Sequence, residues 1–274
     1  MKKIGIIGYG NMGSAIAERI KTEYNVLVFD KDKSKKPGKG IIFSATVVDL
    51  VEKSDVLILA VKPQDFDACL AEIKSCPHLG DKLFISIAAG ITTAHIEKVL
   101  GVVRVVRAMP NLPAKIGQGV TCLAKGKFAS LQDFEFADDI FEYMGEIMEI
   151  DESMMSAATA VSGSGPGFLC DLVDGKTSEE MERFAEKVFV PTLTASANSL
   201  GFTASQSAIL ASSTSAGTIS IIKVMHVSPE ELKKQVTSKK GTTEAGLKEL
   251  KHDINNLDAA VKAAKKRAEE LSKG

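Results

Sequence analysis

The sequence predicts an α/β fold in which a doubly wound parallel sheet is followed by an all-helical domain. In the first half of the chain, apolar runs of strand length alternate with segments whose apolar residues recur three to four positions apart, as they do in amphipathic helices. In the second half the strand runs disappear and the helical spacing remains. Repeated strand, helix and strand units build a parallel sheet with right-handed crossovers, so the change of pattern indicates two domains. The 274 residues of the chain suffice for two, since a single core rarely grows beyond about 250 residues.

The strands of the predicted sheet are near-continuous apolar runs, which are typical of a sheet covered by helices on both faces. They are expected at residues 3–8, 25–30, 40–44, 55–61, 82–88 and 103–109. The helices between them are expected at residues 12–21, 45–54, 64–74 and 92–100. A last strand pair, 119–126 and 146–151, brackets a helix at 130–145 and is expected to close a first domain of residues 1–151.

Residues 152–274 are predicted to form the helical domain. One helix is expected at 177–188 with Thr177 or Ser178 as its cap, and a second from Pro191 to Gly201. Helices are also expected at 203–225, 243–250 and 254–272. The helix at 203–225 is rich in Ala, Ser and Gly; we expect it to be buried, in part against another subunit, because serines, threonines and Lys223 interrupt it too often for a membrane span.

Composition excludes several classes of function. The formal net charge of −1 gives no reason to expect nucleic acid or an anionic membrane as a partner. The four cysteines form no Cys-x-x-Cys pair and the histidines lack zinc spacing, so we expect reduced thiols and no metal site. The apolar run after the first three residues is too short for a signal peptide. A cytoplasmic protein is the expectation.

A glycine motif follows the first predicted strand. GYGNMG places Gly8, Gly10 and Gly13 in the spacing Gly-x-Gly-x-x-Gly, and Asp30 ends the second strand about 20 residues later. Strand, glycines, helix and acid together form the fingerprint of a Rossmann-type dinucleotide-binding domain. Gly8 is expected to make the tight turn, Gly10 to let the backbone approach a pyrophosphate, and Gly13 to let helix and strand pack closely.

The fingerprint also indicates which dinucleotide binds. The backbone N–H groups of Asn11 and Met12, at the start of the first helix, are expected to face the phosphates. Asp30 would accept a hydrogen bond from the ribose 2′-hydroxyl of NADH and repel the 2′-phosphate of NADPH. The nearby lysines could instead attract that phosphate; they are Lys31, Lys33, Lys35 and Lys36. We favour NADH, because an acid at contact distance outweighs lysines on a solvated loop, and NADPH stays open.

Two further segments end strands on the cofactor side of the predicted sheet, where ligands of doubly wound sheets bind. They are LAVKP at 59–63 and RAMPNLPA at 107–114. Their candidate cofactor-binding residues are Ala60, Val61, Lys62, Pro63, Met109, Pro110 and Asn111. The segment AVSGSGPGFL at 160–169 is interpreted either as a wall of the reaction site, with Ser162 or Ser164 donating to the cofactor, or as a glycine-rich linker.

These motifs, together with SIAAGIT at 86–92 and VTSKKGTTEAGL at 236–247, resemble in order and spacing those of the pyrroline-5-carboxylate reductases. The resemblance extends from Lys3 to about Leu271. It implies NAD(P)H-dependent reduction of a cyclic imine to proline, by a Rossmann-type domain followed by a helical substrate and dimerisation domain. It also implies at least a dimer, with dimers that can assemble into rings, and an active site that includes the partner's helical domain.

By the same resemblance, the Thr243 hydroxyl would act at the ring nitrogen. The backbone N–H groups of Gly241 and Thr242, beside Ser238, would hold the substrate carboxylate, which suits a helix N-terminus. Ser164 would contact the cofactor.

Two departures from the family pattern put the substrate in doubt. Lys239 and Lys240 stand where the family has Pro-Gly, and residues 170–188 form an insertion that we expect to be an ordered helix. Alternatives are therefore a reductase of another cyclic imine, a non-catalytic dinucleotide-binding regulator, and a hydroxyacid dehydrogenase with Lys176 as its general acid.

Overall fold

A computed structural model describes residues 1–272, which group into two compact units. The sheet unit contains Met1–Ala108 and Leu123–Glu152, and the helical unit contains Met109–Cys122 and the described chain from Ser153 onward. The expected border at residue 151 differs from this division in one segment, 109–122, which groups with the helices. Gly217 on a helix explains the difference, since a Cβ there would collide with Gln118 O and lie 2.6 Å from Pro113 Cβ.

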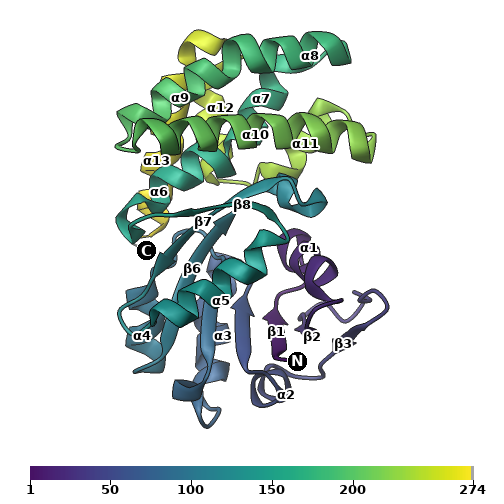
Figure 1. Ribbon diagram of the computed structural model, residues 1–274, viewed down its shortest axis with the longest axis vertical. Coiled ribbons are helices and arrows are strands. Elements are labelled where there is room, and N and C mark those ends of the chain that lie inside the picture. The colour runs from purple at the N-terminus through teal and green to yellow at the C-terminus, as the bar shows by residue number, and fades with distance from the viewer. Residues whose placement is uncertain (273–274) are drawn as a thin grey trace. The chain divides into compact units, whose positions relative to one another are not determined.

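Within the described residues, eight strands form one sheet in the order β3-β2-β1-β4-β5-β6-β7-β8 (Figure 1). Strands β1 to β6 pair in parallel. The chain moves outward from β1 through β2 to β3, then returns to the other side of β1 at β4. The order therefore reverses between β1 and β4, the place where doubly wound sheets bind ligands. The strand bounds are β1 Lys3–Ile7, β2 Asn25–Phe29, β3 Ile41–Phe43, β4 Val56–Leu59, β5 Leu83–Ser86, β6 Arg104–Pro110, β7 Gly119–Lys125 and β8 Gly145–Glu149.

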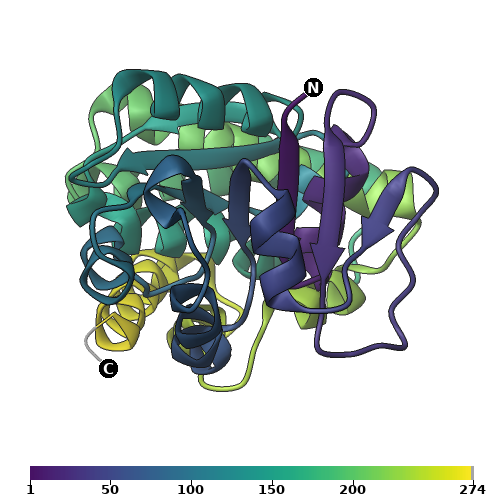
Figure 2. The same cartoon turned by 90° about the horizontal axis from the view of Figure 1, so that it is seen from below.

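The helices of the sheet unit begin close to where the sequence predicts them. They are α1 Asn11–Ile20, α2 Val47–Lys53, α3 Pro63–Lys74, α4 Thr93–Leu100 and α5 Leu131–Glu142. Thr46, Thr92 and Ser130 cap α2, α4 and α5 through their hydroxyls, as helix N-termini prefer. Helices α2, α3 and α4 share one buried cluster with the strands, and Figure 2 shows them on the opposite side of the sheet from α5. Burial on both faces explains the continuous apolar strands.

The helical unit carries no strand beyond those of the sheet in its described residues. Its elements are the 3₁₀ turn η2 Leu112–Ile116, α6 Met155–Ala158, the π-helical turn η4 Thr159–Gly163, α7 Gly165–Val173, α8 Ser178–Phe184, the π-helical turn η5 Ala185–Phe189, α9 Val190–Ser199, α10 Ala204–Met225, α11 Pro229–Val236, α12 Thr242–Leu250 and α13 Leu257–Leu271. Short 3₁₀ turns lie at Leu79–Asp81, Glu152–Met154 and Ile254–Asn256.

The prediction of two separate helices around Pro191 is wrong. α8, η5 and α9 follow one another without a break. Pro191 has no N–H to donate, and the wider turn before it, in which Val190 N–H bonds Ala185 O, accommodates the missing bond. Thr177, one of the two expected caps, caps α8 in a reciprocal pair of bonds with Glu180.

Helix α11 was missed from the sequence, although its start carries a recognisable signal. Ser228 caps it, Pro229 takes the first helical position, and Glu231 returns a bond to the Ser228 N–H. A serine followed three residues later by Glu is a capping box, and proline suits the first turn. The helix is short, and its apolar spacing rests on Leu232 and Val236 alone, four residues apart, so the sequence offers too few apolar residues to identify it.

Helix α10 is long and apolar enough to cross a membrane by length and composition alone. Half of its most apolar window is buried inside the chain, including Leu210, Thr214 and Gly217. A core helix of a globular domain has the same composition, and the burial favours that interpretation.

Candidate functional site

A groove of about 610 Å³ lies at the carboxyl ends of the strands where the sheet order reverses. Its volume lies within the usual range for small-molecule sites. Six predicted cofactor residues line it: Gly8, Gly10, Asp30, Ala60, Val61 and Lys62. We call it the β1–β4 groove.

Three glycines shape the mouth of this groove, each in a different way. Gly8 has φ +102°, and a Cβ there would lie 2.5 Å from Ala60 O. At Gly13 a Cβ would collide with Gly8 O, so α1 packs directly on the turn. At Gly10, by contrast, a Cβ would meet no atom of the described chain within 4 Å. The first and third glycines are needed for folding, whereas the space above Gly10 is open to a ligand.

The N-terminus of α1 is arranged to receive an anion. Gly10 is its N-cap and offers no side chain to the free N–H groups of Asn11 and Met12. The first turn of α1, all of it described, contains no acidic residue. The unpaired N–H groups and the positive end of the helix dipole therefore favour a phosphate. Pro63 takes the first position of α3, and Lys62 is the N-cap of that helix.

Asp30 is held in its ionised form at the end of β2. It is 8% exposed and accepts hydrogen bonds from Tyr9 N–H at 2.7 Å, Asp32 N–H at 2.9 Å and Lys35 Nζ at 2.7 Å. Burial by itself would raise the pKa of Asp30, but the bonds from Lys35, Asp32 and Tyr9 outweigh it and lower the pKa. The carboxylate is a fixed negative charge in the groove.

The lysines beside Asp30 are engaged by the chain itself. Lys31 pairs with Asp65 at 2.8 Å, and Lys33 donates to Ala45 O at 3.1 Å while lying over the Phe29 ring. With Lys35 bound to Asp30, three of the four candidate lysines have partners. A 2′-phosphate would have to displace these contacts.

A second group of predicted residues meets in the helical unit. Thr243 is 3% exposed, and its hydroxyl donates to Ser164 Oγ at 3.2 Å. Ser164 in turn donates to Thr242 Oγ1 at 3.1 Å. Thr242 and Thr243 are the first two residues of α12. The predicted catalytic threonine, one substrate residue and one cofactor residue thus form one hydroxyl cluster at a helix N-terminus.

The loop before α12 differs from the expectation in one detail. Gly241 N–H donates to Ser238 O at 2.9 Å, and the Ser238 hydroxyl lies against Gly241. That N–H already has a partner, so the free donors of this turn are those of Thr242, Thr243 and Glu244. Lys240 has φ +59° and is held by bonds from its N–H to Glu244 Oε2 at 2.7 Å and from Arg267 Nε to its carbonyl at 2.8 Å.

Asn111 presents an unused donor. It is 2% exposed, and its Oδ1 accepts from Val120 N–H at 3.0 Å. Its buried Nδ2 has no hydrogen-bond partner among residues 1–272. Buried polar groups are nearly always paired, so this amide fits a ligand that accepts from it. Met109 extends over Gly163 from the same strand end, and Pro110 is the last residue of β6.

The linker interpretation of AVSGSGPGFL is wrong. These residues form the π-helical turn η4 and the start of α7, and Ser162 and Ser164 are fully buried. Ser162 donates to Ala158 O within its own helix, whereas Ser164 reaches the hydroxyl cluster. Small residues are needed here for close packing, because a Cβ at Gly165 would lie 2.8 Å from Thr214 Cγ2.

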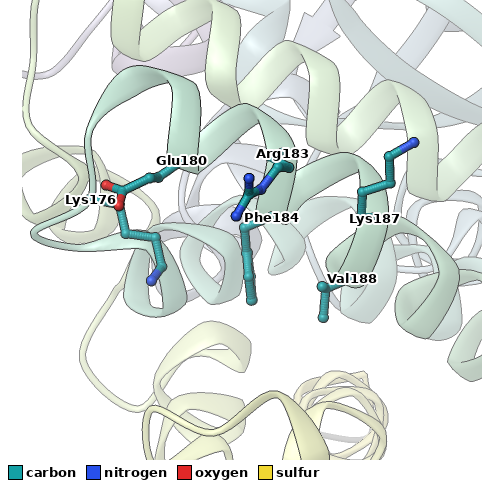
Figure 3. Close-up of a pocket in the computed structure, with 6 residues that line it drawn as sticks. All are labelled: Lys176, Glu180, Arg183, Phe184, Lys187 and Val188. Carbon is teal, nitrogen blue, oxygen red and sulfur yellow. The ribbon is translucent and has the colours of Figure 1, made fainter.

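A second cavity, of about 300 Å³, lies along α8 and η5. Figure 3 shows the amines of Lys176 and Lys187 pointing to different sides, while Phe184 and Val188 point to the same one. The charges do not converge on a common point. Lys176 Nζ lies 5.7 Å from the centre of the Phe184 ring on an exposed face, which gives no support to a role as general acid.

The cysteines are not nucleophiles. All four are free and buried, and burial raises the pKa of the Cys69, Cys122 and Cys170 thiols to about 12. They are protonated at neutral pH.

The chain is similar to known proteins over its whole length. It is 35% identical to a pyrroline-5-carboxylate reductase of Methanosarcina acetivorans, with 99% of this chain and 97% of that protein covered. The chain belongs to the pyrroline-5-carboxylate reductase family. The resemblance inferred from the motifs is confirmed, and with it the assignment as an oxidoreductase.

Solved structures of this family confirm the fold. A pyrroline-5-carboxylate reductase from Coxiella burnetii matches with TM-score 0.65 and 29% identity, covering 100% of this chain and 99% of that one. The Plasmodium falciparum enzyme, solved with NADP bound, matches with TM-score 0.64 and 27% identity, covering 99% and 98%. The family model for pyrroline-5-carboxylate reductase dimerisation matches residues 187–271, and one for NADP oxidoreductase, coenzyme F420-dependent, matches residues 3–90. A nicotinamide cofactor and self-association follow from family membership.

The groove contains residues that the motifs did not single out. Most of them lie on α3, as adjacent residues that recur about one helical turn apart: Gln64, Asp65, Ala68, Cys69 and Glu72. Their spacing on one helix face after Pro63 is the signal that could have identified them.

Proposed function

We propose that this chain reduces 1-pyrroline-5-carboxylate to proline. The observation that carries the proposal is the hydroxyl cluster of buried Thr243 and Ser164 and half-buried Thr242 at the N-terminus of α12, in a member of this reductase family. A cyclic imine with a carboxylate needs a polar group at its nitrogen and a site for its negative charge. The cluster supplies the first and the free N–H groups of the helix turn supply the second.

The reaction needs no strong acid from the protein. Bound reduced nicotinamide supplies the hydride. Thr243 fixes the ring nitrogen with its hydroxyl, and the N–H groups of Thr242 and Thr243 hold the carboxylate. An imine that arrives protonated accepts a hydride without further proton transfer, which fits a cluster composed of neutral hydroxyl groups. Ser164 orients Thr243, because it accepts the Thr243 hydrogen bond.

Thr243→Val tests this role. Valine keeps the methyl that packs on Gly167 and loses the hydroxyl, so we expect a fold as stable as the wild type and kcat about tenfold to a hundredfold lower, the loss expected for a hydrogen bond at a reacting centre. Thr243→Ser, which keeps the hydroxyl, is the matched control and should retain most activity. Equal rates for valine and threonine at position 243 would reject the assignment.

We further propose that the cofactor is NADH rather than NADPH. Asp30 lies in the groove as a carboxylate, and Lys31, Lys33 and Lys35 are engaged with other groups. Fluorescence titration of the purified protein should give a lower Kd for NADH than for NADPH, and Asp30→Asn should narrow the difference. Tighter binding of NADPH by the wild type would overturn this preference.

The assembly is proposed to be at least a dimer, with rings of dimers as the larger form, in a cytoplasmic enzyme. Small and apolar residues exposed along α10, among them Ala208, Ile209 and Ala216, offer a surface on which helices approach closely. Light scattering at micromolar concentration should give a mass of twice the chain mass of 29.2 kDa or a larger multiple. A monomer would contradict the proposal.

A further inference from the structure

One face of α7 contacts both helices that flank the loop at 237–241. Ser164, Gly167, Phe168 and Asp171 are spaced three and four apart and so lie on the same face. A Cβ at Gly167 would lie 2.5 Å from Thr243 Cγ2 and 3.1 Å from Val236 Cγ2. The missing side chain therefore lets the last residue of α11 and the proposed catalytic threonine of α12 pack together on α7.

One turn further along α7, Asp171 makes the polar contacts of the same face. Its side chain is only 5% exposed. It accepts from Lys233 Nζ of α11 at 3.1 Å and lies 3.0 Å from Nδ1 of His252, just past the end of α12. Glu230, 2.5 Å from Lys233, is the other carboxylate at this point. A single buried carboxylate thus contacts α11 through Lys233 and, through the exposed His252, the segment that directly follows α12.

The protonated state of Lys233 is favoured by this arrangement. Burial by itself lowers its pKa, but the hydrogen bonds to Glu230 and Asp171 outweigh burial and raise it. Lys233 therefore carries its charge at neutral pH, and its bond to Asp171 is a charge-assisted one of the stronger kind.

We propose that Asp171 is a positioning residue for substrate binding: through Lys233 and His252 it fixes the spacing of α11 and α12 and so the conformation of the loop at 237–241 that leads to the carboxylate-binding turn. The inference rests on the proposed function of that turn. The five residues of the loop run from the end of α11 to the start of α12, so a shift of α11 against α7 is transmitted to Ser238 and Gly241. Asp171 touches neither substrate nor cofactor in this account; it acts through the helices that it joins.

The test compares Asp171→Asn with Asp174→Asn. Asp174, the exposed residue at the end of α7, provides the same loss of charge outside the buried contacts. We expect Asp171→Asn to raise the KM for 1-pyrroline-5-carboxylate about tenfold, an effect of the size that loss of a charge-assisted bond can have. The kcat should change less than about threefold, because Asp171 does not contact the reacting atoms. The Kd of NADH should not change, because Asp171 lies outside the β1–β4 groove, and Asp174→Asn should match the wild type.

A second readout does not depend on turnover. Amide hydrogen exchange, followed by mass spectrometry, should accelerate in residues 236–246 of Asp171→Asn and not in the same residues of Asp174→Asn. If the wild type does not reduce 1-pyrroline-5-carboxylate, the proposed function fails, but the exchange data still show whether the contacts of Asp171 with Lys233 and His252 hold the loop at 237–241 in place. Identical exchange and identical KM in the two variants would overturn the inference, as would acceleration spread over the whole helical unit.

A milder pair of variants applies if Asp171→Asn does not fold. Lys233→Met removes the ion pair with Asp171 and keeps the apolar part of the side chain. Lys234→Met is the control, because the neighbouring Lys234 side chain is 73% exposed. We expect the same local acceleration and the same rise in KM, smaller in size, for Lys233→Met alone. Equal behaviour of the two lysine variants would overturn the inference.

Discussion

Replacing Gly10 by alanine should weaken cofactor binding at least about tenfold while leaving the fold intact. A Cβ at this position meets no atom of the described chain within 4 Å, and its backbone, φ −85° and ψ −161°, is open to any residue. Alanine loses less chain entropy on folding, worth about 0.4–1 kcal/mol, and is a poorer N-cap by a similar amount. The two effects offset each other, so the melting temperature should stay within roughly 4 °C of the wild type.

The neighbouring glycines provide the contrast. Gly8→Ala places a side chain at φ +102° and 2.5 Å from Ala60 O, which should cost about 1–3 kcal/mol and lower the melting temperature by roughly 2–12 °C. A methyl group at Gly10 would instead occupy the approach of the pyrophosphate to α1. Loss of one charge-assisted bond to a backbone N–H weakens binding by about 1.5–3 kcal/mol, or roughly tenfold to a hundredfold in Kd.

Thermal denaturation without cofactor and fluorescence titration with NADH measure the two effects separately. Gly10→Ala should melt like the wild type and bind NADH at least about tenfold more weakly. Binding of NADH by Gly10→Ala as tight as by the wild type, or melting of Gly10→Ala as early as Gly8→Ala, would contradict this prediction.

Two further predictions concern stability. The pKa of Asp30 is lowered in the folded protein, so its contribution to the free energy of unfolding is present above the unfolded pKa of about 4 and is lost as the pH falls through and below that value. The melting temperature of Asp30→Asn should therefore lie below that of the wild type at pH 7, and the two melting temperatures should converge at acidic pH. A difference in melting temperature that stays constant with pH would contradict the role of the charge. Lys240, at φ +59°, adopts a backbone conformation that costs a residue with a side chain about 1–2 kcal/mol. Lys240→Gly should therefore be neutral or stabilising by up to about 1 kcal/mol after the entropy of glycine is included, while Lys239→Gly, which has no positive φ to relieve, should destabilise the protein. Chemical denaturation of the two variants measures which has the larger free energy of unfolding.

The sheet unit was predictable because its signals are local. Each strand is a continuous apolar run, each helix has its own apolar spacing, and the glycine turn and Asp30 lie within the first 30 residues, so these elements are identified without knowledge of distant contacts. The partners of Lys31, Lys33 and Lys35 were not predictable, since each depends on which carboxylate or carbonyl the folded loop brings within reach.

In the helical unit, resemblance supplied what local pattern could not. Ser164 and Thr243 are 79 positions apart in the chain, and nothing in either motif specifies that their hydroxyls meet. Helix α11 offers only Leu232 and Val236 as an apolar pair four residues apart, too short a pattern to predict a helix. The bond from Gly241 N–H to Ser238 O arises from the turn itself, in which Lys240 takes a left-handed conformation, and a lysine at that position gives no sequence signal for it.

Transfer of an isotopic label shows whether this chain delivers a hydride from NADH to 1-pyrroline-5-carboxylate. The purified protein is incubated with 1-pyrroline-5-carboxylate and NADH that carries deuterium on the transferable position of the nicotinamide, and the product is analysed by mass spectrometry and nuclear magnetic resonance. We expect proline with deuterium on the ring carbon that is bonded to nitrogen and remote from the carboxylate. Absence of proline, or proline without deuterium at that carbon, would contradict it.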